Sequence, residues 1–470
     1  MHETPVAIWS AVPFALLLAC IAVLPLVSKK WWERFFPVVS VGLGLFTVVY
    51  YAVFLNRPGP LIESGFEYIS FIALIGSLYV IAGGIHIRLR GESRPLSNVI
   101  FLAIGALVAN LVGTTGASMI LIRPFIRVNN YRIKPYHIIF FIFIVSNVGG
   151  ALTPVGDPPL FIGYLKGIPF FWSVVNLWYI WLFAVLLILG VFYVVDRREF
   201  AMLDKGEREA AEREGEHGEV VGLHNIIFLA VVLAAVFVTH PPFLREALML
   251  AAAAGSYFTT PSEIHKKNDF DFIPIKEVAI LFIGIFMTMV PALEWISQNA
   301  ASFGFEKAGQ FYWTTGALSS VLDNTPTYLN FLSAAFGMFV KSDVIHHIYT
   351  LIQSHGSALA GAHYPSDVQS TIGAMVTYHP GLVASGSATL QQVSTAYLLS
   401  TRAVIVQAIS VGAVFFGAMT YIGNGPNFMV KSIAEQAGVK CPSFLSYIIR
   451  YTIPILLPIF FLVWFIFFRA

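Results

Sequence analysis

The sequence predicts an all-α polytopic membrane protein, built as an inverted repeat with two re-entrant hairpins and two broken transmembrane helices. Three observations lead to this fold class. The 470 residues are 57% hydrophobic and 11% charged, with a mean hydropathy of +0.75, which is more apolar surface than one soluble core can bury. The charged residues lie mainly between long apolar runs. Glycine, proline and polar residues interrupt four of these runs, and the interruptions follow the same order in both halves.

The composition also excludes several classes of function. No basic tract points to nucleic acid as a partner. Only Cys20 and Cys441 are present, so neither a disulfide framework nor a cysteine metal site is expected. The chain has no His-Glu-x-x-His or Gly-x-Ser-x-Gly motif. We therefore expect no enzyme and no enzyme cofactor.

The first repeat, residues 1–195, is predicted to hold six elements. They are three spans, a hairpin, a broken helix and a last span. Each hairpin arm has about the length of a half crossing, and the tip between the arms is small and polar. In chain order the six elements lie at about 5–27, 36–55, 67–87, 97–127, 137–165 and 174–195.

The second repeat, residues 224–470, follows a charged cytoplasmic linker at 196–223. It repeats the order of the first and carries an extra polar insertion at 341–394, which is expected on the outside. Its six elements are predicted at about 224–239, 244–260, 277–294, 311–340, 396–430 and 446–468.

The distribution of basic residues predicts the orientation. If the N-terminus is outside, most lysines and arginines fall in inside loops, so we expect a multi-pass inner-membrane protein with the N-terminus outside. The first apolar run has no basic residue before it and Lys29, Lys30 and Arg34 after it, which predicts a retained helix. This topology places the mouths of the two hairpins on opposite faces of the membrane.

The stretch 146–159, Ser-Asn-Val-Gly-Gly-Ala-Leu-Thr-Pro-Val-Gly-Asp-Pro-Pro, interrupts the first broken helix. Pro158 and Pro159 have no backbone N–H, and the glycines tolerate backbone that a helix forbids. Irregular backbone at membrane depth is tolerated where it lines a polar cavity, and a carboxylate there indicates an ion or proton pathway. Paired broken helices in inverted repeats are typical of secondary transporters, with the binding site where the breaks converge.

Four polar clusters are predicted to converge at these breaks. They offer hydroxyl, amide and carboxyl oxygens, which suit a hard cation, whereas helix N-termini freed at the breaks suit an anion. The clusters are Asn110, Thr114 and Thr115; Ser146, Asn147, Thr153, Gly156 and Asp157; Ser319, Asp323, Asn324 and Thr325; and Thr420, Gly423, Asn424 and Asn427.

Asp157 and Asp323 favour the cation. Burial and a neighbouring carboxylate both disfavour the ionised form of a carboxyl, so either acid could exchange a proton for a cation. Arg402 is a possible charge partner that could pair with an aspartate or bind a carboxylate substrate, although an interfacial arginine is the simpler interpretation. Asp323 could equally cap the second hairpin arm, and a single helix break could be a packing feature.

The motif at 146–159 resembles the post-hairpin motif of the ion transporter superfamily. This group contains NhaD-type sodium/proton antiporters, citrate transporters, arsenite pump proteins and divalent anion/sodium symporters. The stretches Asn110–Thr115, Leu322–Pro326 and Gly423–Asn427 resemble the family's two hairpin tips and its second unwound motif. The four motifs occur in the family's order, and the resemblance covers nearly the whole chain.

The resemblance implies an elevator-type transporter, usually a homodimer, whose hairpins and broken helices move against a scaffold of the other spans. It implies one cation site at Asn110 and the backbone near Gly156. It implies a second at Asn324, Ser319 and the backbone near Gly423.

Two departures from the symporter pattern favour an antiporter. The symporters typically carry Ser-Asn-Thr at both hairpin tips and Thr where this chain has Asp157, and here two acids would repel a dicarboxylate. We expect a sodium/proton antiporter with membrane lipids, a small inorganic cation and protons as partners. The alternative is a proton- or sodium-coupled transporter of citrate, a dicarboxylate or another oxyanion on the same fold. Sodium is expected at Asn110, Asp157, Asp323 and Asn324.

Overall fold

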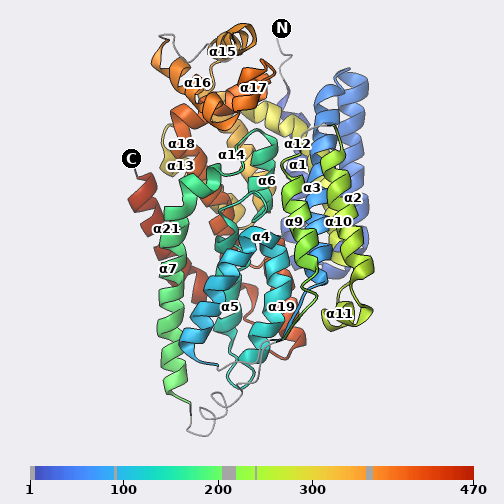
Figure 1. Ribbon diagram of the computed structural model, residues 1–470, viewed down its shortest axis with the longest axis vertical. Coiled ribbons are helices and arrows are strands. Elements are labelled where there is room, and N and C mark those ends of the chain that lie inside the picture. Colours follow the sequence, from blue (N-terminus) through green and yellow to red (C-terminus); the bar gives the residue numbers. More distant parts are fainter. Residues whose placement is uncertain (1–5, 89–92, 204–218, 239–240, 356–363, 470) are drawn as a thin grey trace.

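The computed structural model shows an elongated bundle of helices (Figure 1). Helices α15–α17 lie near the N-terminus at one end, the insertion end, and α7 finishes at the opposite end, the linker end. In the described residues the one sheet is a short antiparallel pair, β1 (His86–Arg88) and β2 (Glu219–Val221). Apart from this strand pair, the described residues confirm the prediction of an all-α protein. The structure describes residues 6–88, 93–203, 219–238, 241–355 and 364–469.

Eight helical segments of the described chain are long and apolar enough to cross a membrane, which makes this a multi-pass membrane protein. The predicted span at 224–239 is shorter than expected, whereas the one at 244–260 matches its helix to within one residue. Helix α9 (Asn225–Ala235) has 11 residues and α10 (Leu244–Thr259) has 16. The chain between them includes Pro241 and Pro242, which lack the N–H groups needed to prolong a helix.

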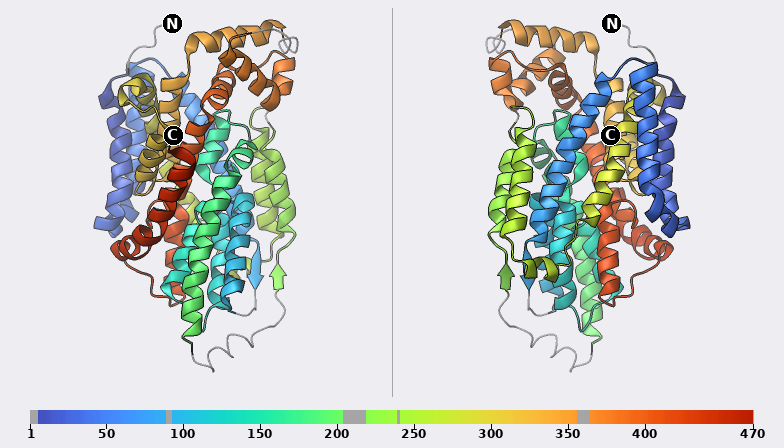
Figure 2. Two further views of the ribbon diagram at one scale, coloured as in Figure 1. Left: turned by 90° about the vertical axis from the view of Figure 1, so that its left-hand side faces the viewer. Right: turned by 90° about the vertical axis from the view of Figure 1, so that its right-hand side faces the viewer.

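A scaffold group of helices lies side by side along one flank of the molecule (Figures 1 and 2). Its members are joined by close backbone contacts and by buried hydroxyls. Ser40 Oγ donates to Ile280 O at 2.8 Å, and Ser64 Oγ donates to Phe286 O at 2.6 Å. The group comprises α1 (Val12–Val27), α2 (Lys29–Val49), α3 (Gly59–Gly83), α9, α10, α11 (Ser262–Lys267) and α12 (Ile273–Asn299).

Helix α4 (Pro95–Val128) folds back on itself. As one straight helix its 34 residues would span roughly 50 Å. Its ends meet instead, because Asn98 Nδ2 donates to Asn129 Oδ1 at 2.8 Å. The reversal occurs at Gly113, whose φ of 78° is a conformation that favours glycine. The segment predicted as a hairpin at 97–127 is therefore two helical arms with a tip at Gly113.

The second hairpin is formed by α13 (Ala308–Ser319) and α14 (Asn324–Phe339). Its arms are held together at the mouth, where the rings of Phe311 and Phe339 lie 6.1 Å apart. The mouth precedes α15 at the insertion end, whereas the mouth of the first hairpin faces the linker end. The two tips therefore point toward each other from opposite ends.

Both predicted broken helices are interrupted. The first consists of α5 (Pro135–Ile144) and α6 (Pro158–Leu165), and the second of α18 (Leu390–Phe416) and α19 (Gly425–Gln436). Helix α7 (Trp172–Ala201) follows the first broken helix. The last span consists of α20 (Phe444–Tyr447) and α21 (Leu457–Val463), which are joined by the π-helical segment Ile448–Leu456 and followed by a second one, Trp464–Phe468.

The predicted polar insertion at 341–394 is a small helical unit, and the helix that follows it begins at Leu390, inside those bounds. It contains α15 (Ser342–His355), α16 (Ser366–Tyr378) and α17 (Pro380–Ala384), while residues 356–363 lie outside the described chain. Side chains of α15 and α16, including Ile348 and Met375, form one buried cluster with the start of α18. Helix α18 begins at Leu390, because Thr389 caps it and bonds Gln392 N at 3.2 Å.

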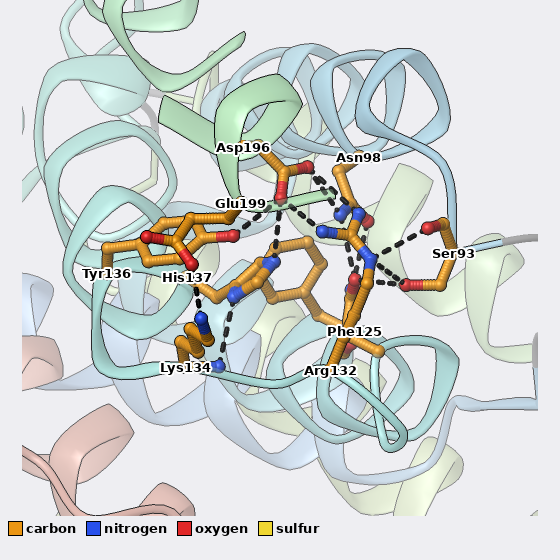
Figure 3. Close-up of polar contacts among 10 residues, drawn as sticks. Ser93, Asn98, Phe125, Arg132, Lys134, Tyr136, His137, Asp196 and Glu199 are labelled. Carbon is orange, nitrogen blue, oxygen red and sulfur yellow. Dashed lines mark hydrogen bonds and ion pairs between the residues drawn. The ribbon is translucent and has the colours of Figure 1, made fainter. Parts of the chain in front are cut away.

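A buried ion pair joins four elements at the linker end (Figure 3). Asp196 on α7 pairs with Arg132 from the α4–α5 connection, and their side chains are 0% and 2% exposed. Tyr136 Oη and Asn98 Nδ2 donate to the same carboxylate at 2.6 and 3.1 Å. His137 Nδ1 accepts from the backbone N–H of Lys134 at 3.1 Å, so its hydrogen is on Nε2, 3.2 Å from Asp196.

This ion pair corrects the predicted boundary of the charged linker at residue 196. Helix α7 continues to Ala201, and Asp196 is a core residue of the linker end. Burial was possible because Arg132 and several neutral donors surround the carboxylate. The middle of the predicted linker, residues 204–218, lies outside the described residues.

Candidate functional site

Asp157 lies where the two hairpin tips and the two helix breaks converge. It is the N-cap of α6 and is 0% exposed. Thr114 Oγ1 from the first tip donates to Asp157 Oδ1 at 2.9 Å. Asn324 Nδ2 from the second tip donates to Oδ2 at 3.0 Å, and Asn424 Nδ2 from the second break lies 3.4 Å from Oδ1. One residue from each of the four predicted clusters therefore meets at a single carboxyl group.

Three asparagines extend this centre between the two breaks. Asn424 Nδ2 also lies 3.2 Å from Asn147 Oδ1. Asn147 Nδ2 donates to Asn427 Oδ1 at 2.7 Å. Asn427 Nδ2 in turn donates to two backbone carbonyls of the second break, both at 2.8 Å. The amide chain satisfies the backbone groups that the interrupted helix leaves without partners.

Asn110 fixes the first break to the first hairpin. Its Oδ1 accepts from Leu152 N at 2.9 Å, and its Nδ2 donates to Gly149 O at 2.6 Å. Thr153 Oγ1 donates to the Asn110 carbonyl at 2.6 Å. Asn110 thus shapes the backbone that presents Asp157, and in the described chain its side chain is hydrogen-bonded to that backbone and not to the carboxylate.

Ser319 and Thr420 perform the corresponding task at the second hairpin. Ser319 Oγ lies 2.7 Å from Asn324 Oδ1 and 2.5 Å from Ala413 O, and its single hydrogen can be donated to either oxygen. Donation to Asn324 Oδ1 orients that amide so that its NH₂ group faces Asp157. Thr420 Oγ1 donates to the carbonyl of Ser320, next to the hairpin tip, at 2.6 Å.

The remaining predicted residues lie around this centre or away from it. Asp323 caps α14, with its side chain accepting from Thr325 N at 3.0 Å, which matches the capping alternative. The Thr325 hydroxyl is buried and has no hydrogen-bond partner in the described chain. Thr115 lines a small cavity beside α3. Arg402 is exposed and lies 5.3 Å from the centre of the Phe339 ring, so the structure does not bring it to Asp157.

Within the part of the chain that the structure describes, no basic side chain is bonded to Asp157. None of the ion pairs formed among the described residues includes Asp157. Its partners are a hydroxyl and two amides, which are neutral donors. A buried carboxylate that lacks a positive partner carries a large desolvation cost, so a proton or a bound cation is needed to neutralise it.

The space beside the first hairpin tip is small. A cavity of about 30 Å³ lies between α3 and the tip, lined in part by Thr115, Gly156 and Tyr79. That volume holds about one water molecule and is far below the size of a ligand pocket for an organic anion. This cavity borders the backbone on both sides of Asp157, at Gly156 and Pro158, and its size suits a small ion.

Two residues of the site were not predicted. Ser118 Oγ lies 2.7 Å from Ser146 Oγ, and Trp181 Nε1 donates to Gly149 O at 3.0 Å. Ser118 is four residues after Thr114, so the two side chains lie on one face of a helix. This spacing could have predicted that Ser118 belongs to the site. Trp181 lies on α7, outside the polar motifs, and the sequence around it has no feature that predicts a role in the site.

The glycines at the first break are required by close packing. A Cβ on Gly156 would lie 2.2 Å from Gly150 O and 2.9 Å from Asn110 Oδ1. We expect Gly156→Ala to displace the first hairpin from the break, at a cost of about 1–3 kcal/mol in stability, and to lower transport at least tenfold. Thermal unfolding in detergent and transport in proteoliposomes measure the two effects.

The control for this prediction is Gly425→Ala, because Gly425 begins α19 directly after the second break and its Cβ would meet nothing within 4 Å. We expect that variant to have the same midpoint of thermal unfolding and the same transport rate as the original protein. Equal behaviour of the two alanine variants would contradict the packing argument.

Comparison with known proteins assigns the chain to one family. The family model CitMHS_2, described as "Putative citrate transport", matches residues 3–468, which is nearly the whole chain. No curated protein matches the sequence. Within the described residues no group of three or more His, Cys, Asp or Glu side chains could hold a metal ion.

Proposed function

We propose that this chain, which belongs to the CitMHS_2 citrate-transport family and is a secondary transporter, exchanges sodium ions for protons. The observation that carries the proposal is the fully buried Asp157 carboxyl, whose hydrogen-bond partners are all neutral. Such a group needs one positive charge, and a proton and a sodium ion can each supply it. Competition between them at one carboxyl gives exchange, because the arrival of either ion displaces the other.

The proposed movement is an elevator motion of the hairpins and broken helices against the scaffold group, in a homodimer with its N-terminus outside. The two hairpins that meet at Asp157 from opposite ends support it. Two ion pairs among the described residues cross between these parts. Lys166 Nζ after α6 lies 2.6 Å from Glu67 Oε1 on α3, and Arg123 Nη2 on α4 lies 3.0 Å from Asp269 Oδ2 before α12. Sliding of one part along the other would have to break both pairs.

A cross-link between the two parts tests the movement. In a background with Cys20 and Cys441 replaced by serine, Lys166→Cys and Glu67→Cys are joined by a short bifunctional thiol reagent. We expect the reagent to reduce sodium/proton exchange by at least 90%, because the cross-link holds α6 against α3. Initial rates in proteoliposomes before and after treatment measure the effect.

A second cysteine pair, Thr371→Cys and Ser400→Cys, serves as the matched control. The two hydroxyls lie 3.3 Å apart, and both belong to the unit formed by the insertion and α18. A cross-link within one moving part should leave exchange unchanged. Full activity of the cross-linked Lys166–Glu67 pair would contradict an elevator motion between these parts.

A second candidate is a proton- or sodium-coupled citrate transporter, which the family's description favours. A citrate transporter of this kind would bind its carboxylate-rich substrate beside the Asp157 carboxyl. Arg402, a basic side chain that could bind such a substrate, lies away from the Asp157 centre in this conformation. Sodium/proton exchange is ranked first because the hydrogen-bond partners of Asp157 among the described residues are all neutral, so no basic side chain there awaits a carboxylate.

Proteoliposomes that contain an internal pH dye separate the two candidates. A proton gradient is imposed, and sodium, lithium, potassium, citrate and succinate are added in turn. Dye recovery with sodium or lithium, in the absence of any carboxylate, is the expected result. A response to citrate or succinate alone would overturn the antiporter and support the second candidate.

A further inference from the structure

The two helix breaks share one hydrogen-bond pattern. In the first break Thr153 Oγ1 donates to Asn110 O at 2.6 Å and accepts from Gly156 N at 3.0 Å. In the second break Thr420 Oγ1 donates to a hairpin carbonyl at 2.6 Å and accepts from Gly423 N at 3.0 Å. In both breaks a threonine hydroxyl thus ties the hairpin to the glycine three residues later. The next residue after that glycine caps the following half-helix.

Asp157 and Asn424 are those two capping residues, and they occupy equivalent positions. Asp157 has φ −141° and ψ 139°, and Asn424 has φ −149° and ψ 142°. Each precedes a half-helix with a proline in its first two positions. The matched backbones therefore present one acid and one amide to the same centre, where the two side chains lie 3.4 Å apart.

The amide nitrogen of Asn424 lies among three oxygen atoms. It is 3.2 Å from Ser146 O, 3.2 Å from Asn147 Oδ1 and 3.4 Å from Asp157 Oδ1. An amide NH₂ group carries two hydrogens and cannot fully satisfy three acceptors. Carbonyl, amide and carboxylate oxygens are the ligands that hard cations prefer. With an acid at position 424, the same oxygens would surround a position suited to a more highly charged cation.

Charge balance decides which cation such a buried centre accepts. Buried charges are stable when they are compensated within the site, because the interior does not solvate a net charge well. One carboxylate balances one monovalent cation. A divalent cation bound by the Asp157 carboxylate would leave a positive charge among its direct ligands, whereas two adjacent carboxylates would balance it. The neighbouring acid, Asp323, caps α14 through Thr325 N and is not hydrogen-bonded to Asp157 or Asn424 in the described chain.

We propose that Asn424 is a specificity-determining residue that restricts the site to monovalent cations. It does so by placing a neutral amide where the equivalent position of the first break places a carboxylate. The inference rests on the proposed sodium/proton exchange and deepens it by assigning the valence of the transported cation to one residue.

Direct binding of radioactive sodium and radioactive calcium to the purified full-length protein in detergent tests the proposal. The original protein should bind sodium saturably and calcium weakly. Asn424→Asp should bind calcium at least tenfold more tightly than the original protein. The double variant Asp157→Asn/Asn424→Asp, which moves the single carboxylate to the equivalent position, should keep sodium binding within about tenfold of the original.

Two controls separate the added charge from other effects. Asn424→Ala removes the amide without adding charge, and we expect no gain in calcium binding. Asn176→Asp adds a carboxylate to α7, beside a cavity at the insertion end, and should likewise gain none. Elution as a single folded species and the midpoint of thermal unfolding identify variants that have lost their fold.

The outcomes distinguish this inference from the proposed function. A folded Asn424→Asp variant that binds sodium and has no gain in calcium affinity overturns the inference. If that variant is unfolded, a folded double variant without sodium binding overturns it instead. An original protein that binds citrate and does not bind sodium overturns the proposed function, and the valence argument with it.

Discussion

Asp157→Asn is expected to abolish sodium-driven proton movement, with initial rates at least 100-fold below those of the original protein. The substitution removes the negative charge that a proton or a sodium ion neutralises, while it keeps nearly the same shape. The asparagine resembles the protonated form of Asp157, so the variant stays in the state to which sodium cannot bind. Proteoliposomes with an internal pH dye, titrated with sodium at a fixed proton gradient, measure the rates.

The fold of this variant should survive the change. The three donors that face Asp157 are neutral, so no positive charge is left buried without a partner. One amide hydrogen of the new side chain faces the Asn324 amide, and the lost or distorted hydrogen bond is worth about 1 kcal/mol. We therefore expect thermal unfolding in detergent close to that of the original protein.

The matched control is Asp269→Asn, which makes the same chemical change at an exposed carboxylate paired with Arg123. It should retain most of the exchange activity, since an exposed ion pair contributes little. An Asp157→Asn variant that keeps more than about one third of the original exchange rate would show that Asp157 is not the exchanging group.

The features that converge at Asp157 could be predicted because their signals are local. Glycine and proline at 149–159 cannot sustain a helix, and a polar hairpin tip inside an apolar run has few alternatives in a membrane. The positions of Thr114, Asn324 and Asn424 followed from these local interruptions. The tip of the first hairpin could not be located to one residue, because the positive φ of Gly113 depends on packing against the break.

The helices of the insertion were harder to predict from the sequence, although one signal for them was present. Ile345, Ile348 and Ile352 recur at helical spacing and form the buried face of α15. The high content of polar residues in 341–394 masked this pattern. The contacts of Arg402 could not be predicted for a different reason. The sequence gives the position of this residue along a helix, but it does not show which side chain the residue lies against.

The ion pair at the linker end was missed because its partners are distant in sequence. Asp196 lies 64 residues from Arg132 and 98 residues from Asn98. The sequence around Asp196 is rich in charge and is typical of a solvated linker. Burial of this acid depends on four elements that meet only in the folded protein (Figure 3).

Asp196→Ala is expected to lower the stability of the protein by about 3–5 kcal/mol, the largest stability effect we predict. The substitution leaves the Arg132 guanidinium buried, 2% exposed, without its counter-charge. Tyr136 Oη and Asn98 Nδ2 would also lose the acceptor that they share. The midpoint of thermal or chemical denaturation in detergent should fall sharply, and the mouth of the first hairpin should separate from α7.

Two variants show whether the effect comes from an uncompensated charge. Glu199→Ala removes an acid three residues away on the same helix, where Lys134 and Glu199 form a partly exposed pair, and should cost under about 1 kcal/mol. Arg132→Leu/Asp196→Ala removes both charges and should recover part of the stability lost by Asp196→Ala, because replacing both ions avoids a buried lone charge. If Asp196→Ala and Glu199→Ala unfold at the same midpoint, the pair does not hold the four elements together.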